Sequence, residues 1–275
     1  MNVLDNVGAK RGRLGVLAPQ MLAFVGILAF AFGSVSCRKG DAEWPSLPEN
    51  RPAAGSIAEA EALYAQRTDL MKVRQALITL RQAMAANPAD FDIAWRAAKY
   101  DYYLGSHSTD GDEQDKAYHD GIEAGKLAIK LNATRPEGHF WLGANYGGNA
   151  EISTLAGLTD IDDIKSEMDA VIKADPTFEG GSAYMALGQV YMKAPKIFGG
   201  DLEKAIGYLE QGIKVGPRNG LLRLRLAQAY AEANRKADAQ KQIDVLMAMK
   251  PVPGYEPEYN DAVKEAKALQ EKIKQ

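Results

Sequence analysis

The chain has 275 residues, of which 46% are hydrophobic and 25% are charged, and its formal net charge at pH 7 is −3. This composition is ordinary for a globular protein. Residues 1–36 carry a net charge of +2, from Lys10, Arg11 and Arg13 against Asp5, so the rest of the chain carries −5. A mildly acidic chain without a basic run argues against nucleic-acid binding.

The N-terminal segment has the pattern of an export signal. Its basic residues precede an apolar run at 21–32 (MLAFVGILAFAF), and small residues lead from there to Cys37, the only cysteine. Twelve apolar residues are few for a membrane span. A lone cysteine directly after such a run resembles the bacterial lipobox, in which the thiol carries the lipid. We therefore expect a lipoprotein-type signal peptide over 1–36, with ordinary secretion and an uncleaved anchor as the alternatives.

The next segment, residues 37–55, has the composition of a tether. It is polar, contains Pro45, Pro48 and Pro52, and shows no helical periodicity. Such sequences form extended linkers, so we expect this stretch to hold a folded domain away from the membrane.

From residue 56 onwards one spacing occurs four times. A small or β-branched residue is followed by an apolar one after four positions, by an apolar or small one after three more, and by proline after another five. One example is Ala205, Leu209, Gly212 and Pro217. Steps of four and three place side chains on one helical face, and the proline ends the helix. Three of the preceding helices share the pattern Leu-(Gly/Ala)-x2-Tyr, starting at Leu142, Leu187 and Leu226.

Together these two patterns are those of the tetratricopeptide repeat (TPR), a pair of antiparallel helices. We predict an all-α, TPR-like solenoid of five helical hairpins over 56–253. A C-terminal capping helix is predicted within 254–275, with Val263, Ala266, Leu269 and Ile273 facing inward. The first repeats are longer than the last, and we expect the extra residues to form long loops at 105–115, 147–160 and 192–200.

Three stretches carry a more specific resemblance: 62–76 (ALYAQRTDLMKVRQA), 136–147 (PEGHFWLGANYG) and above all 194–205 (APKIFGGDLEKA). In them the chain resembles the TatT-like T-component proteins of tripartite ATP-independent periplasmic (TRAP) transporters, which are lipid-anchored helical-repeat proteins. The resemblance implies a protein lipid-anchored through Cys37 in the cell envelope, facing the periplasm, with the outer membrane favoured. It also implies the transporter's solute-binding protein as partner, and self-association. The alternative is a cell-envelope TPR scaffold for complex assembly that binds no small molecule.

In such a solenoid the first helix of each hairpin lines the concave wall. The nine inward positions assigned in three hairpins contain no charged residue. One earlier helix has two registers, which give either Arg96, Tyr100 and Tyr103 or Trp95, Lys99 and Tyr102. Either register adds one cation, which argues against a clamp for acidic peptides. We hypothesise a cavity for a hydrophobic small molecule, and the alternative is that its lining is ordinary core. The lining residues would be Tyr100, Tyr103, Phe140, Met185, Met192 and Leu224.

Catalysis and metal binding find little support in the sequence. The histidines do not form a ligand pair at helical spacing. The acidic loop at 110–115 lacks the glycine and the glutamate of a calcium loop. We therefore predict a protein that is not an enzyme and that binds no metal and no cofactor.

Overall fold

The structure is a computed structural model that describes residues 53–153 and 159–274. These residues form α-helices joined by turns and two short 3-10 helices, without a strand, which confirms the predicted all-α class. The predicted signal peptide and Cys37 lie outside the described residues, as does the tether up to residue 52. None of the described helices has both the length and the apolar character needed to cross a membrane.

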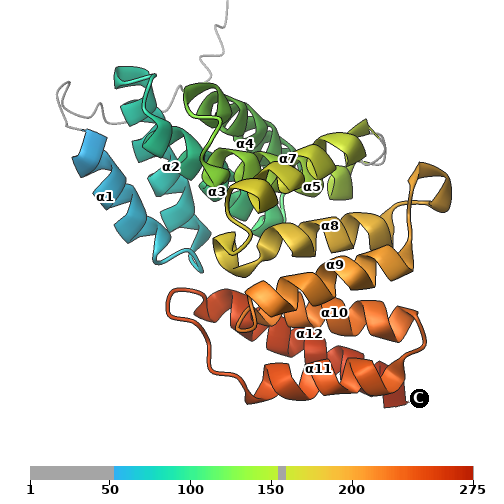
Figure 1. Cartoon of the computed structure of the whole chain (residues 1–275). Helices are drawn as coiled ribbons and strands as arrows, with labels where there is room; N and C mark the ends of the chain where they lie inside the picture. Colours follow the sequence, from blue (N-terminus) through green and yellow to red (C-terminus); the bar gives the residue numbers. More distant parts are fainter. Residues whose placement is uncertain (1–52, 154–158, 275) are drawn as a thin grey trace, which may run out of the picture. The chain divides into compact units, whose positions relative to one another are not determined.

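The helices pair in chain order into five hairpins followed by one terminal helix (Figure 1). The hairpins are α1–α2, α3–α4, α5–α7, α8–α9 and α10–α11, and α12 packs on the last of them. The bounds are α1 Ala53–Tyr64, α2 Leu70–Ala86, α3 Phe91–His107, α4 Gly111–Leu131, α5 Pro136–Ile152, α7 Ile161–Ala174, α8 Ser182–Lys193, α9 Leu202–Val215, α10 Gly220–Glu232, α11 Lys236–Ala248 and α12 Glu256–Lys274.

Small residues in the repeat pattern bring neighbouring helices close together, both within a hairpin and between successive hairpins. A Cβ atom added at Gly188 of α8 would lie 2.6 Å from Cγ of Leu209 on α9. A Cβ atom at Gly125 of α4 would lie 2.9 Å from Cα of Leu142 on α5. The leucines of the pattern are themselves buried. Close helix contact is therefore why these positions hold glycine or alanine.

The terminal helix covers the end of the repeat stack. Ala262 and Ala266 are fully buried and pack with Leu224, Ile243 and Leu246 of α10 and α11. Val263, Leu269 and Ile273 are half-buried against the same cluster, as predicted. Burying one stripe of α12 closes an apolar edge that the last hairpin would otherwise leave in water.

In two of the three expected long loops, most of the residues that the structure describes are helical. The extra residues lengthen helices instead, because α3 runs to His107 and α4 begins at Gly111, while α5 continues to Ile152. Asp110 caps α4 by accepting hydrogen bonds from the backbone amides of Asp112 and Glu113, at 3.0 and 3.1 Å. The acidic residues that we expected in a loop at 110–115 therefore cap and begin α4, and negative charge is favourable in the first turn of a helix.

The first helices of successive hairpins also contact one another. Besides its partner α4, α3 packs against α5, and α8 packs against both α5 and α10. These first helices therefore form a shared inner row of the stack.

Candidate functional site

The six residues predicted to line a ligand cavity are distributed over three packing clusters. Four of them are buried, namely Tyr100, Tyr103, Phe140 and Leu224, while Met185 and Met192 are half-buried. The two tyrosines and the phenylalanine belong to the core of the first three hairpins. The methionines pack against the α9–α10 cluster, and the leucine packs under α12. The structure brings the tyrosines together and the methionines together, and the common cavity stays a prediction.

Three tyrosine rings form a platform between α1 and α3. The ring of Tyr64 stacks on that of Tyr100, with centroids 4.0 Å apart and planes 6° apart. The Tyr103 ring meets Tyr64 edge-on at 5.6 Å. Burial raises the pKa of Tyr103 to about 12 and that of Tyr64 well above its usual value. The platform is therefore neutral at physiological pH and presents ring faces suited to cations.

Arg67, in the turn between α1 and α2, lies over this platform. Its guanidinium carbon is 5.3 Å from the ring centroid of Tyr64 and 5.7 Å from that of Tyr103. Two nitrogens donate to the carboxylate of Glu258 on α12 at 2.9 and 2.7 Å, and one also donates to the Gly254 carbonyl at 2.6 Å. Burial opposes the charge, but the hydrogen bonds and charge of Glu258 outweigh it and raise the pKa of Arg67.

A second cation, Lys99 of α3, lies over the rings of Tyr64 and Trp141 at 5.8 and 5.0 Å. Its ammonium nitrogen is 3.3 Å from a carboxylate oxygen of Glu179, which also accepts a hydrogen bond from the Tyr255 hydroxyl. We call the five residues Arg67, Lys99, Glu179, Tyr255 and Glu258 the clasp, because they join the first two hairpins to the turn before α8 and to the start of α12.

The backbone of Glu179 has an unfavourable conformation, and this conformation positions its carboxylate. Its φ of 47° lies in the left-handed region, and Gly180 and Gly181 follow with φ of 62° and 77°. Left-handed geometry is easy for glycine and costs a glutamate about 1 kcal/mol or more. Strain of this kind persists where surrounding contacts impose it, and Lys99 and Tyr255 supply such contacts.

Of the clasp residues, only Lys99 was predicted from the sequence, in one of the two registers. Arg67, Glu179, Tyr255 and Glu258 were not predicted. The Arg67–Glu258 pair spans 191 positions and the Lys99–Glu179 pair spans 80, far beyond any helical spacing. The only local signal is the Glu-Gly-Gly sequence at 179–181, which marks an unusual turn.

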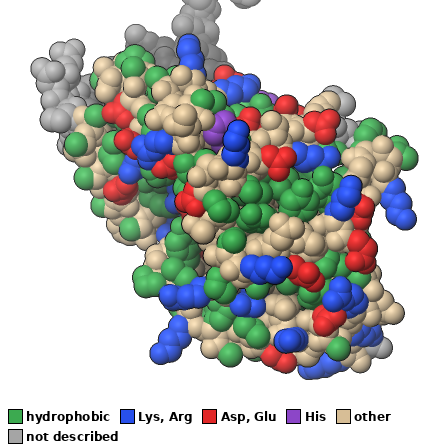
Figure 2. Space-filling model, in the orientation of Figure 1, with side chains coloured by type: hydrophobic (Ala, Val, Ile, Leu, Met, Phe, Trp, Pro, Cys, Tyr) green, Lys and Arg blue, Asp and Glu red, His purple; other side chains and the backbone are tan. Residues whose placement is uncertain are grey.

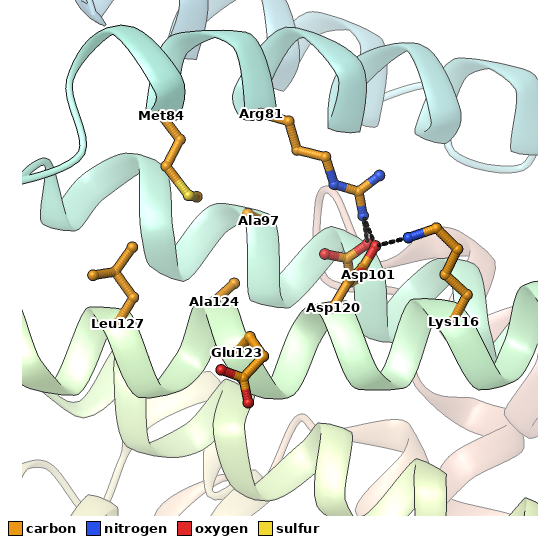
Figure 3. A pocket seen from close by; sticks show the side chains of 9 residues that line it. All are labelled: Arg81, Met84, Ala97, Asp101, Lys116, Asp120, Glu123, Ala124 and Leu127. Carbon is orange, nitrogen blue, oxygen red and sulfur yellow. Dashed lines mark hydrogen bonds and ion pairs between the residues drawn. The ribbon is translucent and has the colours of Figure 1, made fainter. Parts of the chain in front are cut away.

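A separate pocket of about 420 Å³ lies over α3, between α2 and α4 (Figure 3). One end is apolar, with Met84, Ala97, Ala124 and Leu127, and the other is charged, with Arg81, Asp101, Lys116 and Asp120, while Glu123 lies beside Ala124 and points away from this charged group. Arg81 donates to Asp101 at 2.6 Å and to Asp120 at 2.8 Å. Asp101 is only 1% exposed, and burial raises its pKa to about 7 against the opposing charge of Arg81. The charges of Arg81, Asp101, Lys116 and Asp120 pair with one another and link α2 of the first hairpin to α3 and α4 of the second.

The turn between α8 and α9 presents apolar side chains to solvent. The Ile197 side chain is 86% exposed and that of Phe198 is 42% exposed. This turn projects at the right of Figure 1, and Figure 2 shows hydrophobic side chains beside basic ones at that edge. Ile197 and Phe198 therefore present apolar side chains to water at this turn.

Comparison with known proteins identifies the repeat class. The family model "Regulator of microtubule dynamics protein 1-3" matches residues 56–189, and a tetratricopeptide-repeat model matches 199–265. No curated protein sequence matches the chain.

Solved structures of TPR proteins have the same fold. The thermophilic TPR protein TTC0263 of Thermus thermophilus is 18% identical, with a TM-score of 0.58 over 79% of this chain and 100% of its own. PilF of Pseudomonas aeruginosa is 13% identical, with a TM-score of 0.52 over 80% of this chain and 91% of its own. At such low identity the likeness shows the fold alone.

Proposed function

Because the chain is a TPR-type helical repeat protein, we propose that it is a non-catalytic scaffold that binds a protein partner. The finer proposal is that it is the lipid-anchored, periplasmic accessory protein of a TRAP-type transport system. Its partner would then be the solute-binding protein. The observation that carries this proposal is Ile197, because it projects from the stretch 194–205 that carries the resemblance to the T-component proteins.

The turn that bears Ile197 is firmly built. The amides of Phe198 and Gly200 donate to the Pro195 carbonyl at 2.8 and 3.1 Å, and that of Asp201 donates to the Tyr191 carbonyl at 2.8 Å. A side chain at Gly200 would overlap the Ala194 carbonyl. Ile197 is thus presented in a fixed position, and an ordered contact residue loses little conformational entropy when it binds.

Burial of Ile197 would give a partner a substantial gain. Moving a large aliphatic side chain out of water contributes about 1.5–3 kcal/mol. Lys196, beside it in the same turn, is exposed, and Lys193 at the end of α8 pairs with Glu151. A partner surface with an apolar pocket and an acidic rim fits this turn.

The test is co-purification of the full chain from its native envelope. Ile197→Asp should reduce the recovered solute-binding protein by about tenfold or more, because a charge replaces the buried contact. Met247→Asp is the matched control, since Met247 is a 40% exposed apolar residue on α11 and should leave recovery unchanged. Recovery of envelope assembly proteins without any solute-binding protein would overturn the transport role and support the alternative scaffold.

The proposed anchor has its own measurement. Mass spectrometry of the mature protein should find an acylated N-terminal cysteine derived from Cys37, and Cys37→Ser should appear in the soluble fraction. An intact N-terminus that still contains residues 1–36 would contradict the lipoprotein proposal.

A further inference from the structure

The clasp is a site whose two halves come from distant parts of the chain. The first hairpins supply the cations Arg67 and Lys99 together with aromatic rings. The carboxylates come from Glu258 and Glu179, which lie much later in the sequence. The Arg67 side chain is 7% exposed, so its charge depends on a counter-charge at close range.

The segment that fills this site is partly irregular, because Gly254 and Tyr255 precede α12 and Glu256–Glu258 form its first turn. Residues 250–255, between α11 and α12, contain no helix, and Gly254 has a φ of 86°. Gly254 and Glu258 are held by Arg67, and Tyr255 is held by Glu179. Local regions that depend on few contacts open at a lower free energy than the packed core.

The rest of α12 is anchored independently of the clasp. Ala262 and Ala266 are fully buried against α10 and α11, and the Tyr259 hydroxyl donates to the Met249 carbonyl at 2.7 Å. Gly254–Glu258 can therefore leave the clasp if the first turn of α12 unwinds, while Tyr259 and the helix after it stay packed.

We propose that Gly254–Glu258 is an internal occupant of a binding site, and that the site accepts an acidic, tyrosine-bearing segment of a partner protein when this occupant leaves. Charge complementarity defines the partner, because departure of Glu258 leaves the buried guanidinium of Arg67 without a counter-charge. A partner carboxylate restores the pair, and a partner aromatic side chain takes the place of Tyr255. None of these residues belongs to the α8–α9 turn, so this proposal stands or falls separately from the proposed function.

Because Gly254–Glu258 already occupies the site, a partner must bind more strongly than this tethered segment. A tethered segment acts at a high effective concentration, on the order of millimolar for a short flexible link. A weak acidic peptide therefore does not displace it, whereas a partner that makes additional contacts elsewhere does. The site therefore stays occupied by Gly254–Glu258 until such a partner is present.

The test uses the displaced segment itself as the probe. A labelled peptide with the sequence of residues 252–260 (VPGYEPEYN) is titrated into the full chain and into the double variant Tyr255→Ala/Glu258→Ala, with fluorescence anisotropy as the readout. We expect the peptide to bind the double variant about tenfold or more tightly than the wild type, because the internal competitor is weakened.

Two matched controls define specificity. Adding Arg67→Ala to the double variant should weaken peptide binding about tenfold or more, since the buried cation is lost. Adding Arg74→Ala instead should leave it unchanged, although Arg74 makes a similar 2.7 Å pair with Glu113. A peptide with glutamine at both glutamate positions should bind the double variant weakly. Its affinity should equal that of the unaltered peptide for the triple variant that contains Arg67→Ala. Equal binding to wild type and double variant, or no loss with Arg67→Ala, would overturn the proposal.

Amide hydrogen exchange on the full chain separates site occupancy from fold stability. In the double variant, residues 249–258 and 64–67 should exchange faster while α10 and α11 keep their protection. The reversed pair Arg67→Glu/Glu258→Arg should restore slow exchange at 249–258. Faster exchange throughout α10 and α11 would show that these contacts hold the fold together, and it would overturn the proposal.

Discussion

The hairpins before and after the turn at 179–181 are built differently. The first half has helices of up to 21 residues and buries polar groups such as Arg67, Asp101 and Asn145 among aromatic rings. The second half, from α8 to α11, has helices of 12–14 residues with a largely aliphatic core. Aliphatic packing forms most of the second half, whereas the first half buries more polar side chains.

The family matches divide the chain in the same way. The general TPR model matches 199–265, in the regular half, while a different family model matches 56–189. Departures from the standard repeat thus coincide with the buried polar residues. In this chain, regular repeats form the stack, and the loss of regularity accompanies buried polar contacts. Variants in each half test this difference.

The largest effect is expected where a helix contact is made by backbone. A methyl group at Gly125 meets Cα of Leu142, which cannot rotate away, whereas one at Gly188 meets the side chain of Leu209. Gly125→Ala should lower the free energy of unfolding by about 3 kcal/mol and Gly188→Ala by about 1 kcal/mol. Urea unfolding curves measure both, and equal losses would show that the two halves pack alike.

A smaller loss is expected from a buried amide in the first half. Asn145 is fully buried, and its Nδ2 donates to the carbonyls of Ala98 and Trp141 at 2.9 and 2.7 Å. Asn145→Ala leaves the Ala98 carbonyl without this donor and should cost about 2 kcal/mol. Gln240→Ala, which removes an exposed side-chain hydrogen bond to Asp244 in the second half, should change stability by less than about 0.5 kcal/mol in the same assay.

The two halves also differed in how well the sequence predicted them. Leu226, Tyr230 and Ala239 sit at standard TPR spacings, and their burial follows from helical periodicity. The tyrosines at 100 and 103 were assigned to a concave wall, but the sequence could not show that Tyr64 stacks on Tyr100 and meets Tyr103 edge-on. Arg67 and Glu258 meet only because the whole stack brings them together, and periodicity carries no information about such contacts.

Asp101 should give the first half a distinctive pH dependence. The pKa of the Asp101 carboxyl is about 7 in the folded protein, whereas an aspartate in the unfolded chain has a pKa of about 4. The folded state binds more protons in between, so stability falls as pH rises through that window. Relative to Asp101→Asn, the wild type should lose about 1.4 kcal/mol or more between pH 5 and 7, measured by urea unfolding. Parallel pH profiles for the two proteins would contradict the assignment.

The smallest effect should be a gain in the second half. Gly207 lies inside α9, and a Cβ atom there would meet nothing within 4 Å. Gly207→Ala should therefore raise the free energy of unfolding by up to about 1 kcal/mol, because alanine loses less backbone entropy in a helix. A loss of stability in thermal unfolding would show that this face of α9 is in contact after all.

The ion pair between Arg67 and Glu258 has a consequence for how the protein comes apart. Linear repeat arrays touch only their neighbours, so their outermost units melt first and independently. Here the opening hairpin and the closing helix are tied to each other, and neither end can fray while the tie holds. We expect calorimetry to show a single melting transition whose onset moves to lower temperature, without splitting in two, when Arg67 is replaced by alanine.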